Sequence, residues 1–533
     1  MSSSNEPLLR AFSTESLRAS LKRLQTMGVN DLLAEQAEQS SLQKKIDLTA
    51  VEMMTMLEKA HGGSSTTDQT TLNFLATAWD FVEIGEGKHR RVAIVDPLLE
   101  LLLIALTFQI APKIESSRVP ISERRVFSYR WIGDEVGFNP KVGWGAFEQA
   151  ELASLSSSQY IAEIDISLFY ESISEQLVEM SLHKIGVERE DVRCMMTLLS
   201  HLRVSEFGLP VGGHFSRILA EACLCASDWA LIESGVHFIR FVDDYRIFAD
   251  DIASLRRHIL KITQTLGGLG LSINKGKLRT FKSSELLETR LLTTDMSIEN
   301  QYGAEPLIVR HHFDPYSQLV GHRVDELKAI SNSENLSQTL VYELDKIEPN
   351  YRSLKFIFAA IKFATPSEQL DCLTMIYQNL ERQILNRLSL PILNLTSTLI
   401  DSIDEKHRVK LAGMLWDYLK AEFEQCAAGT LCHWIRALNT LGVDTSTRQQ
   451  WRLMVISSLD TPILLRREVL QWELSLQSRS SELPVLLSSL KETLSEGDFG
   501  WINSLLFAME SKEELERMED PSASICHLLA RLT

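Results

Sequence analysis

Residues 236–248 read VHFIRFVDDYRIF, and this stretch decides how the chain is interpreted. Two short runs of apolar and aromatic residues flank one acidic pair, Asp243 and Asp244. Runs of this kind predict the two strands of a β-hairpin with both carboxylates in its turn. Crowded carboxylates in apolar surroundings are costly unless a partner or a metal ion holds them. The pair therefore indicates a metal site rather than an ordinary surface turn.

A third carboxylate comes from an earlier segment of the chain. Residues 160–166 (YIAEIDI) alternate apolar and polar residues as a strand does, and they contain Asp165. Three aspartates and the phosphates of an incoming nucleotide are ligands that suit Mg²⁺. A pair of such ions stabilises both the attacking and the leaving oxygen of a phosphoryl displacement. We therefore expect Asp165, Asp243 and Asp244 to hold two Mg²⁺ ions, with Mn²⁺ as a substitute.

Four segments around these aspartates resemble the motifs of reverse transcriptases, and they occur in the same order. Residues 165–170 (DISLFY) resemble motif A, and residues 208–217 (GLPVGGHFSR) are similar to motif B. Residues 241–245 (FVDDY) resemble the hairpin of motif C, and residues 271–277 (LSINKGK) resemble motif D. The resemblance extends over about residues 75 to 300. It implies an α+β fold of fingers and palm and a nucleotidyltransferase activity.

The resemblance also implies a role for each motif residue. Asp165, Asp243 and Asp244 take the positions of the catalytic residues, and the same three aspartates with Ile166 take those of the metal ligands. An aromatic residue five positions after the first aspartate lies under the sugar in this family and excludes a 2′-hydroxyl. Tyr170 has that position, which implies deoxynucleoside triphosphates as substrates. Taken alone, this tyrosine would be interpreted as a core aromatic residue.

Further nucleotide contacts are implied in motifs B and D and in the fingers. The glycines of residues 208–213 let the backbone approach a nucleotide closely because they have no Cβ. Lys277 can approach the phosphates, although an exposed lysine is the simpler interpretation of that residue by itself. Three arginines of the fingers are candidates for the triphosphate or a nucleic-acid backbone. The predicted nucleotide-binding set is Tyr170, Pro210, Val211, Gly212, Lys277, Arg124, Arg125 and Arg130.

Motif B differs at two positions from that of many templated reverse transcriptases, and these differences narrow the resemblance to one branch of the family. Many templated reverse transcriptases have Gln after the motif B proline and end the motif with Ser-Pro, whereas this chain has Val211 and then Ser216 followed by Arg217. Together with residues 240–248 (RFVDDYRIF), these features resemble the bacterial abortive-infection and defence-associated reverse transcriptases. That resemblance implies an antiphage role, a helical-repeat C-terminal domain in place of a thumb, and homo-oligomers that are trimers or hexamers.

The resemblance leaves the mode of synthesis open. Some members make single-stranded DNA without a template and prime it on a protein hydroxyl, so that the product stays covalently attached. Others use a partner non-coding RNA as template. The absence of Gln at position 211 puts ordinary templated copying in doubt. An alternative of another class is a catalytically silent palm that acts as an interaction scaffold, which the presence of all three aspartates disfavours.

The C-terminal half has a different pattern. After about residue 310 the strand signals fade, and amphipathic helical segments follow one another. Their lengths and short breaks favour paired helices in a HEAT-like array, with an ordinary helical bundle as the alternative. We therefore expect an N-terminal helical region at residues 1–74, reverse-transcriptase-like fingers and palm at 75–305, and an all-α HEAT-like repeat domain at 306–533.

Two further expectations concern the structure around the palm. Residues 70–82 and residues 96–110 are predicted as helices. The order strand, helix, hairpin, helix, strand from residue 160 onward fits an antiparallel sheet with its helices on one face.

Composition limits the remaining alternatives. The net charge of −17 argues against non-specific nucleic-acid binding. Residues 88–130 nevertheless hold an excess of basic residues, which could form a phosphate-binding face or only a solvated surface. The seven scattered cysteines predict free thiols in a reducing cytoplasm. The longest apolar segment, residues 98–111, is too interrupted for a membrane span and predicts a buried helix.

Overall fold

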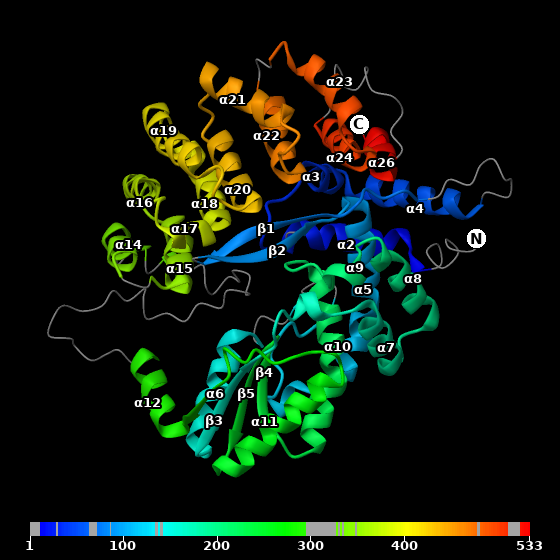
Figure 1. The fold of residues 1–533 in the computed structure, drawn as a ribbon, viewed down its shortest axis with the longest axis vertical. Coiled ribbons are helices and arrows are strands. Elements are labelled where there is room, and N and C mark those ends of the chain that lie inside the picture. Colours follow the sequence, from blue (N-terminus) through cyan, green and yellow to red (C-terminus); the bar gives the residue numbers. More distant parts are fainter. Residues whose placement is uncertain are drawn as a thin grey trace. The chain divides into compact units, whose positions relative to one another are not determined.

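The computed structural model describes residues 11–27, 30–62, 72–85, 87–133, 137–138, 142–294, 327–328, 331–332, 335–346, 349–476, 480–509 and 523–532. The chain divides into two compact units, whose helices and strands are labelled in Figure 1. The helical unit comprises Met1–Ala105, Asn335–Tyr351 and Ile357–Thr533, and the sheet unit comprises Leu106–Glu334 and Arg352–Phe356.

The predicted three-region division remains a prediction. Its first boundary, at residue 74, falls inside the helical unit, which groups the N-terminal helices with the C-terminal ones. Its second boundary, between residues 305 and 306, lies outside the described residues.

The sheet unit is built on the antiparallel sheet that the motifs predict. Its strands are β3 (Tyr160–Asp165), β4 (His237–Phe241), β5 (Asp244–Ala249) and β6 (Arg279–Lys282), in the order β4-β5-β3-β6. Every neighbouring pair is antiparallel, and β3 pairs with both β5 and β6. The predicted strand at residues 160–166 and the predicted hairpin at 236–248 are therefore confirmed. Their pairing brings the strand of motif A beside the hairpin of motif C.

Helices connect these strands, and single residues mark where two of the helices begin or end. Gly186 takes a left-handed conformation and ends α7, and α8 begins three residues later at Arg189. Asp251 caps the first turn of α11 by accepting a hydrogen bond from the Ser254 amide. The described helices are α6 (Trp144–Ser157), α7 (Glu175–Ile185), α8 (Arg189–Ser200), α9 (Val204–Phe207), α10 (His214–Glu233), α11 (Ile252–Gly267) and α12 (Ser283–Thr294).

The expectation of helices on one face of the sheet is wrong. Tyr245 and Arg246 are neighbours on β5, so their side chains point to opposite faces. The Tyr245 hydroxyl donates to Asp228 of α10, whereas the Arg246 guanidinium pairs with Glu151 of α6 at 3.0 Å. Helices therefore cover both faces. Because an unpaired buried charge is costly, the buried guanidinium of Arg246 requires an acidic partner, and Glu151 of α6 is that partner.

The predicted helix at residues 70–82 is also wrong. Residues 72–77 form no regular element, and β1 (Ala78–Gly85) pairs with β2 (Lys88–Ile94) in an antiparallel hairpin. The run AWDFVEIG is rich in aromatic and β-branched side chains, which suit a strand. The glycines Gly85 and Gly87 supply the positive φ angles that a tight turn requires.

The apolar segment after β2 forms α5 (Pro97–Ser117), as predicted. This helix is long and apolar enough to cross a membrane, but 83% of its most apolar window is buried inside the protein. The interpretation of residues 98–111 as a buried helix is therefore confirmed.

The helical unit consists of many short helices around the β1–β2 hairpin. Successive helices pack mainly on the next but one, as α18 does on α20, α20 on α22 and α22 on α24 (Figure 1). The C-terminal helices close on the N-terminal ones, since α24 packs on α3 and α26 on α4. The described helices are α2 (Thr14–Met27), α3 (Ala37–Lys44), α4 (Ile46–Gly62), α14 (Leu336–Leu344), α15 (Tyr351–Ile361), α16 (Pro366–Gln378), α17 (Gln383–Arg387), α18 (Ser389–Leu399), α19 (Glu405–Glu422), α20 (Ala428–Thr440), α21 (Ser446–Ser457), α22 (Ile463–Ser475), α23 (Leu483–Thr493), α24 (Glu496–Ala508) and α26 (Ser524–Leu532).

Close packing ties the hairpin to these helices. A Cβ at Gly429 of α20 would lie 2.6 Å from Val82 of β1, so only glycine fits there. The Glu83 amide donates to the Thr430 hydroxyl of the same helix. All seven cysteines are free thiols, as predicted. That the array is HEAT-like remains a prediction.

Candidate active site

The three predicted metal-site aspartates lie at one end of the sheet. Asp165 is the last residue of β3 and is the cross-strand partner of Asp244, the first residue of β5. The next amide along β3, that of Ile166, donates to the Asp243 carbonyl at 3.1 Å. The antiparallel register of β3 and β5 thus brings motif A and motif C together.

The turn that carries the acidic pair contains a strained residue. Val242 has a φ of 56°, in the left-handed region. A β-branched residue is rarely found there, because its Cβ crowds the backbone. The cost is on the order of 1–3 kcal/mol, and such a conformation persists only where the surrounding structure fixes it.

The electrostatics of the acids reflect partial burial. Asp165 has 8% of its surface exposed. Burial raises the pKa of the Asp244 carboxyl; the Arg246 guanidinium lowers it again, and the Asp165 carboxylate raises it further. The negative charge of Asp165 thus disfavours the ionised form of Asp244, a cost that a shared cation would remove.

Lys277 of motif D pairs with one of the three aspartates. Lys277 places its Nζ 2.9 Å from Oδ1 of Asp165, and the Asn274 side-chain amide donates to Oδ2 at 3.3 Å. The Asn274 main-chain amide donates to the Asp165 carbonyl at 2.7 Å. The structure therefore brings Lys277 to the acids, whereas its predicted contact with phosphates remains a prediction.

The donor set suits Mg²⁺, because carboxylate and carbonyl oxygens are its preferred protein ligands. Among the described residues, no group of three or more His, Cys, Asp or Glu side chains is already arranged around one metal position. The Lys277 ammonium now neutralises one oxygen of Asp165, so a metal ion there would compete with it. The metal ligands Asp165, Ile166, Asp243 and Asp244 remain predictions that this chemistry fits.

Tyr170 lies within the electrostatic reach of one of these acids, Asp243. It begins the short 3-10 helix Tyr170–Ser172, and its ring packs against Phe169. Burial raises the pKa of its hydroxyl well above the usual value, and the charges of Arg217 and Asp243 also act on it. The predicted position of Tyr170 under the sugar of a nucleotide remains a prediction.

The glycine-rich loop of motif B packs on motif A. A Cβ at Gly208 would lie 2.4 Å from the Glu171 carbonyl oxygen, and Gly208 also has a φ of 71°. The Leu209 amide donates to the Tyr170 carbonyl at 2.9 Å. The close approach that this glycine permits is thus to the chain's own backbone. The next three residues in the chain are the predicted nucleotide contacts Pro210, Val211 and Gly212. Val211 is half-buried, and the other two are buried.

The three candidate arginines of the fingers differ in exposure. Arg124 is exposed, while Arg125 is half-buried and donates to the Phe238 carbonyl at 3.2 Å. Arg130 has only 2% of its surface exposed and pairs with Glu115 at 2.7 Å. Contact of Arg130 with a triphosphate would require it to leave Glu115. All three assignments stay predictions.

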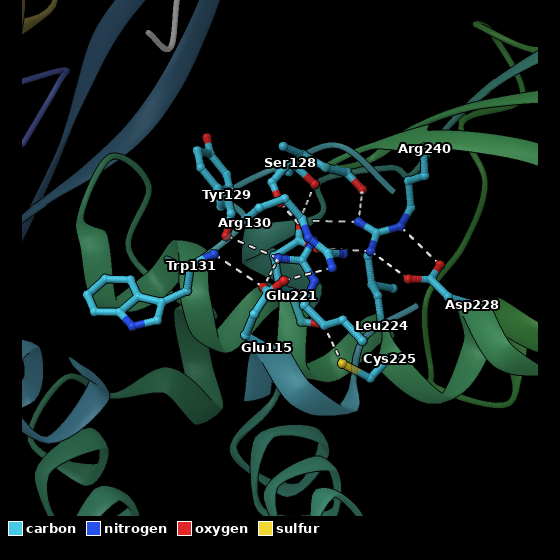
Figure 2. Close-up of polar contacts among 12 residues, drawn as sticks. Glu115, Ser128, Tyr129, Arg130, Trp131, Glu221, Leu224, Cys225, Asp228 and Arg240 are labelled. Atoms are coloured by element: carbon cyan, nitrogen blue, oxygen red, sulfur yellow. Dashed lines mark hydrogen bonds and ion pairs between the residues drawn. The ribbon is translucent and has the colours of Figure 1, made fainter. Parts of the chain in front are cut away.

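A buried network of charges, which the sequence did not reveal, joins α10 to Arg240 of β4, the strand before the acidic turn (Figure 2). Glu221 of α10 accepts from Arg118 at 2.6 Å, from Ser128 at 2.5 Å and from Arg240 at 2.9 Å. Although burial alone would raise it, the pKa of Glu221 is lowered by the two arginines. The network balances three cations with three acids: Arg118, Arg130, Arg240, Glu115, Glu221 and Asp228.

This network also changes the interpretation of the basic stretch at residues 88–130. Arg118 and Arg130 belong to it and are buried, so they contribute nothing to a phosphate-binding face. Lys88, Arg90 and Arg124 are exposed. Neither alternative for this stretch, a phosphate-binding face or a solvated surface, applies to the two buried arginines.

Comparison with known proteins agrees with the geometry. Residues 124–295 match the family model described as reverse transcriptase (RNA-dependent DNA polymerase). These residues form a reverse transcriptase domain. The domain contains all four motif segments and the three aspartates, and it implies polymerisation of nucleotides.

Other comparisons are less informative. The comparison with curated proteins gave no match. Among solved structures, the chain is similar to telomerase from Candida albicans, solved in complex with a TWJ fragment of telomeric RNA, at 10% identity. That match covers 80% of this chain and 71% of the other with a TM-score of 0.30, which does not establish a common fold.

Proposed function

We propose that this chain is a DNA polymerase of the reverse transcriptase type that adds deoxynucleotides by two-metal-ion catalysis. The observation that carries the proposal is the pairing of Asp165 with Asp244 at the sheet end where Asp243 also lies. The matched domain supplies the reaction class, and the three carboxylates supply the ligands that the reaction needs.

Each residue has a physical role in this proposal. Asp165, Asp243 and Asp244 hold the metal ions, which when bound stabilise charge on the attacking and leaving oxygens. Tyr170 packs under the sugar and leaves no room for a 2′-hydroxyl. Lys277 leaves Asp165 when the nucleotide enters and donates to the phosphates, where a cation stabilises the developing negative charge.

The biological setting is a further part of the proposal. Val211 and the Ser216–Arg217 pair resemble the defence-associated branch, and the many helices after residue 335 are compatible with its helical domain. We therefore propose an antiphage role in the cytoplasm, with assembly into a trimer or hexamer. For the mode of synthesis we propose untemplated, protein-primed synthesis, with copying of a partner non-coding RNA as the alternative.

One experiment separates these modes. The purified full chain is incubated with Mg²⁺ and labelled deoxynucleotides, with no nucleic acid in one arm and with RNA co-expressed from the native locus in another. Products are resolved before and after protease digestion, and D165N is run alongside. Label in a protease-sensitive product without nucleic acid supports self-priming, and label that requires RNA supports templated synthesis. No label in either arm contradicts the polymerase proposal and favours the scaffold.

A further inference from the structure

The turn between β4 and β5 needs a partner that fixes it. Val242 holds its left-handed φ of 56° directly before the two aspartates. Glycine would take this conformation without strain, but valine does so only where contacts hold it. The orientation of Asp243 and Asp244 therefore depends on what fixes the backbone of Val242.

Arg240 makes that contact. Its Nη1 donates to the Val242 carbonyl at 2.8 Å, and its side chain is fully buried. Its main chain is held as well, because its amide donates to the Arg125 carbonyl at 2.7 Å and its carbonyl accepts from the Phe127 amide at 3.0 Å. The main chain of Arg240 is thus fixed by two hydrogen bonds, while its guanidinium binds the carbonyl of the turn residue Val242.

Two acids of α10 hold the guanidinium in place (Figure 2). Nε and Nη2 of Arg240 donate to Asp228 at 3.0 and 2.6 Å, and Nη1 and Nη2 donate to Glu221 at 3.2 and 2.9 Å. The two acids are about two helical turns apart, so they project from the same face of α10. A planar fork of donors is required to satisfy both acids and the carbonyl together, and lysine lacks it.

Resting on the proposed function, we infer that Arg240 is a positioning residue for the metal site. Held by Glu221 and Asp228, it fixes the turn so that Asp243 and Asp244 present their carboxylates together. The helix that follows motif B thereby supports the acids of motif C. Partners of this kind, which orient a metal ligand without touching the metal, change metal affinity or activity by roughly 10- to 100-fold when they are altered.

The helical unit offers a matched control for substitution of Arg240. Arg452 is also fully buried, pairs with Asp444 at 2.7 Å and with Glu473 at 2.6 Å, and lies over the Trp472 ring. R240K and R452K therefore remove the same buried fork of donors in two different units. A loss of stability in both variants reports the packing of a buried arginine. A loss of metal binding that is confined to R240K reports the metal site.

The test measures metal binding as well as activity. Mn²⁺ binding to wild type, R240K and R452K is followed by electron paramagnetic resonance, and deoxynucleotide incorporation is measured against Mg²⁺ concentration. We expect R240K to weaken Mn²⁺ binding roughly 10- to 100-fold and to raise the Mg²⁺ requirement in parallel. R452K should keep wild-type values for both. If R240K does not fold, D228N, which leaves Arg240 in place with one weakened partner, should shift both measurements in the same direction.

The outcomes distinguish this inference from the proposed function. R240K with wild-type Mn²⁺ affinity and wild-type Mg²⁺ dependence overturns the role of Arg240 alone. A wild type that incorporates nothing, while R240K still weakens Mn²⁺ binding, overturns the polymerase function alone. A wild type that neither binds Mn²⁺ nor incorporates nucleotides overturns both.

Discussion

The ammonium of Lys277 lies 2.9 Å from Oδ1 of Asp165, so a side chain of motif D occupies the surroundings of a proposed metal ligand. The pair is unequal, because the Lys277 side chain is 64% exposed whereas that of Asp165 is 12% exposed. An exposed lysine can leave at little cost, since pairs of this kind contribute about 0–1 kcal/mol. In the proposed reaction, this contact stabilises Asp165 until a metal ion and a nucleotide bind.

Substitution of Lys277 should separate metal binding from catalysis. K277M removes the competing cation, so half-saturation should come at a Mg²⁺ concentration lower by up to roughly fivefold, which corresponds to about 1 kcal/mol. The maximal incorporation rate should fall roughly 100-fold, because one donor to the developing charge is lost. Incorporation across a Mg²⁺ titration measures both quantities. K275M, at an exposed lysine two residues away, is the control; equal effects in the two variants would refute the role of Lys277.

Substitution of Gly208 should destabilise the sheet unit through a single contact. G208A places a methyl group 2.4 Å from the Glu171 carbonyl oxygen, so the loop must move. Gly235 has the same φ of 71°, yet a Cβ there has nothing within 4 Å. G235A therefore shows the cost of the conformation alone, about 1 kcal/mol, and G208A should exceed it by at least about 1–3 kcal/mol in the free energy of unfolding. Equal losses in the two variants would show that the loop is not packed on motif A as described.

Substitution of Tyr170 should change the choice of sugar. Y170A removes the ring proposed to exclude a 2′-hydroxyl, so the ratio of kcat/KM for ribonucleotides to that for deoxynucleotides should rise roughly 10- to 100-fold. Y170F keeps the ring and should keep the wild-type ratio. Single-nucleotide incorporation with each sugar measures this ratio. A ratio unchanged by Y170A would assign sugar selection to another residue.

The helical unit should lose stability as pH rises through neutrality. Burial raises the pKa of Glu100 to about 8, although its hydrogen bond from Gln39 lowers it, and burial raises the pKa of Asp96 to about 6. Between the ordinary pKa near 4.5 and about 8, the folded chain keeps a proton on Glu100 that the unfolded chain has released. The free energy of unfolding therefore falls by up to about 1.4 kcal/mol per pH unit in this window, and the loss ends above about pH 8.

Thermal unfolding at a series of pH values tests this pH dependence. E100Q keeps the side-chain size and its contact with Gln39 but cannot ionise, so its unfolding midpoint should fall less than that of wild type between pH 5 and 8. E58Q, at an exposed glutamate of α4, should behave as wild type. A midpoint that falls equally in E100Q would place the titrating group elsewhere.

The strands that carry motifs A and C could be predicted from the sequence, whereas the buried charge network beside them could not. Residues 160–166 predicted a strand through apolar alternation, and residues 236–248 predicted a hairpin through two apolar and aromatic runs. The register of the strands then placed Asp165 opposite Asp244. The charge network could not be predicted, since Glu115, Glu221 and Arg240 are far apart in the chain. One available signal was the presence of two acids, Glu221 and Asp228, two turns apart in the largely apolar central part of α10.

The error at β1 has a local cause. Residues 70–82 contain apolar side chains at spacings that suit a helix or a strand, and the pairing of β1 with β2 decided between them. That choice depended on the turn at Gly85 and Gly87 and on close packing against Gly429, which no local pattern reveals.

The central claim is that Asp243 and Asp244 carry catalysis, and the chain offers a control only a few residues away. Asp250 and Asp251 form a second acidic pair that is exposed beyond β5, and asparagine at position 251 can still cap α11. The decisive measurement is the rate of deoxynucleotide incorporation, at saturating Mg²⁺, by D243N/D244N and by D250N/D251N. We expect the first variant to lose incorporation and the second to retain the wild-type rate. Incorporation by D243N/D244N at the rate of D250N/D251N would show that these two aspartates do not carry catalysis.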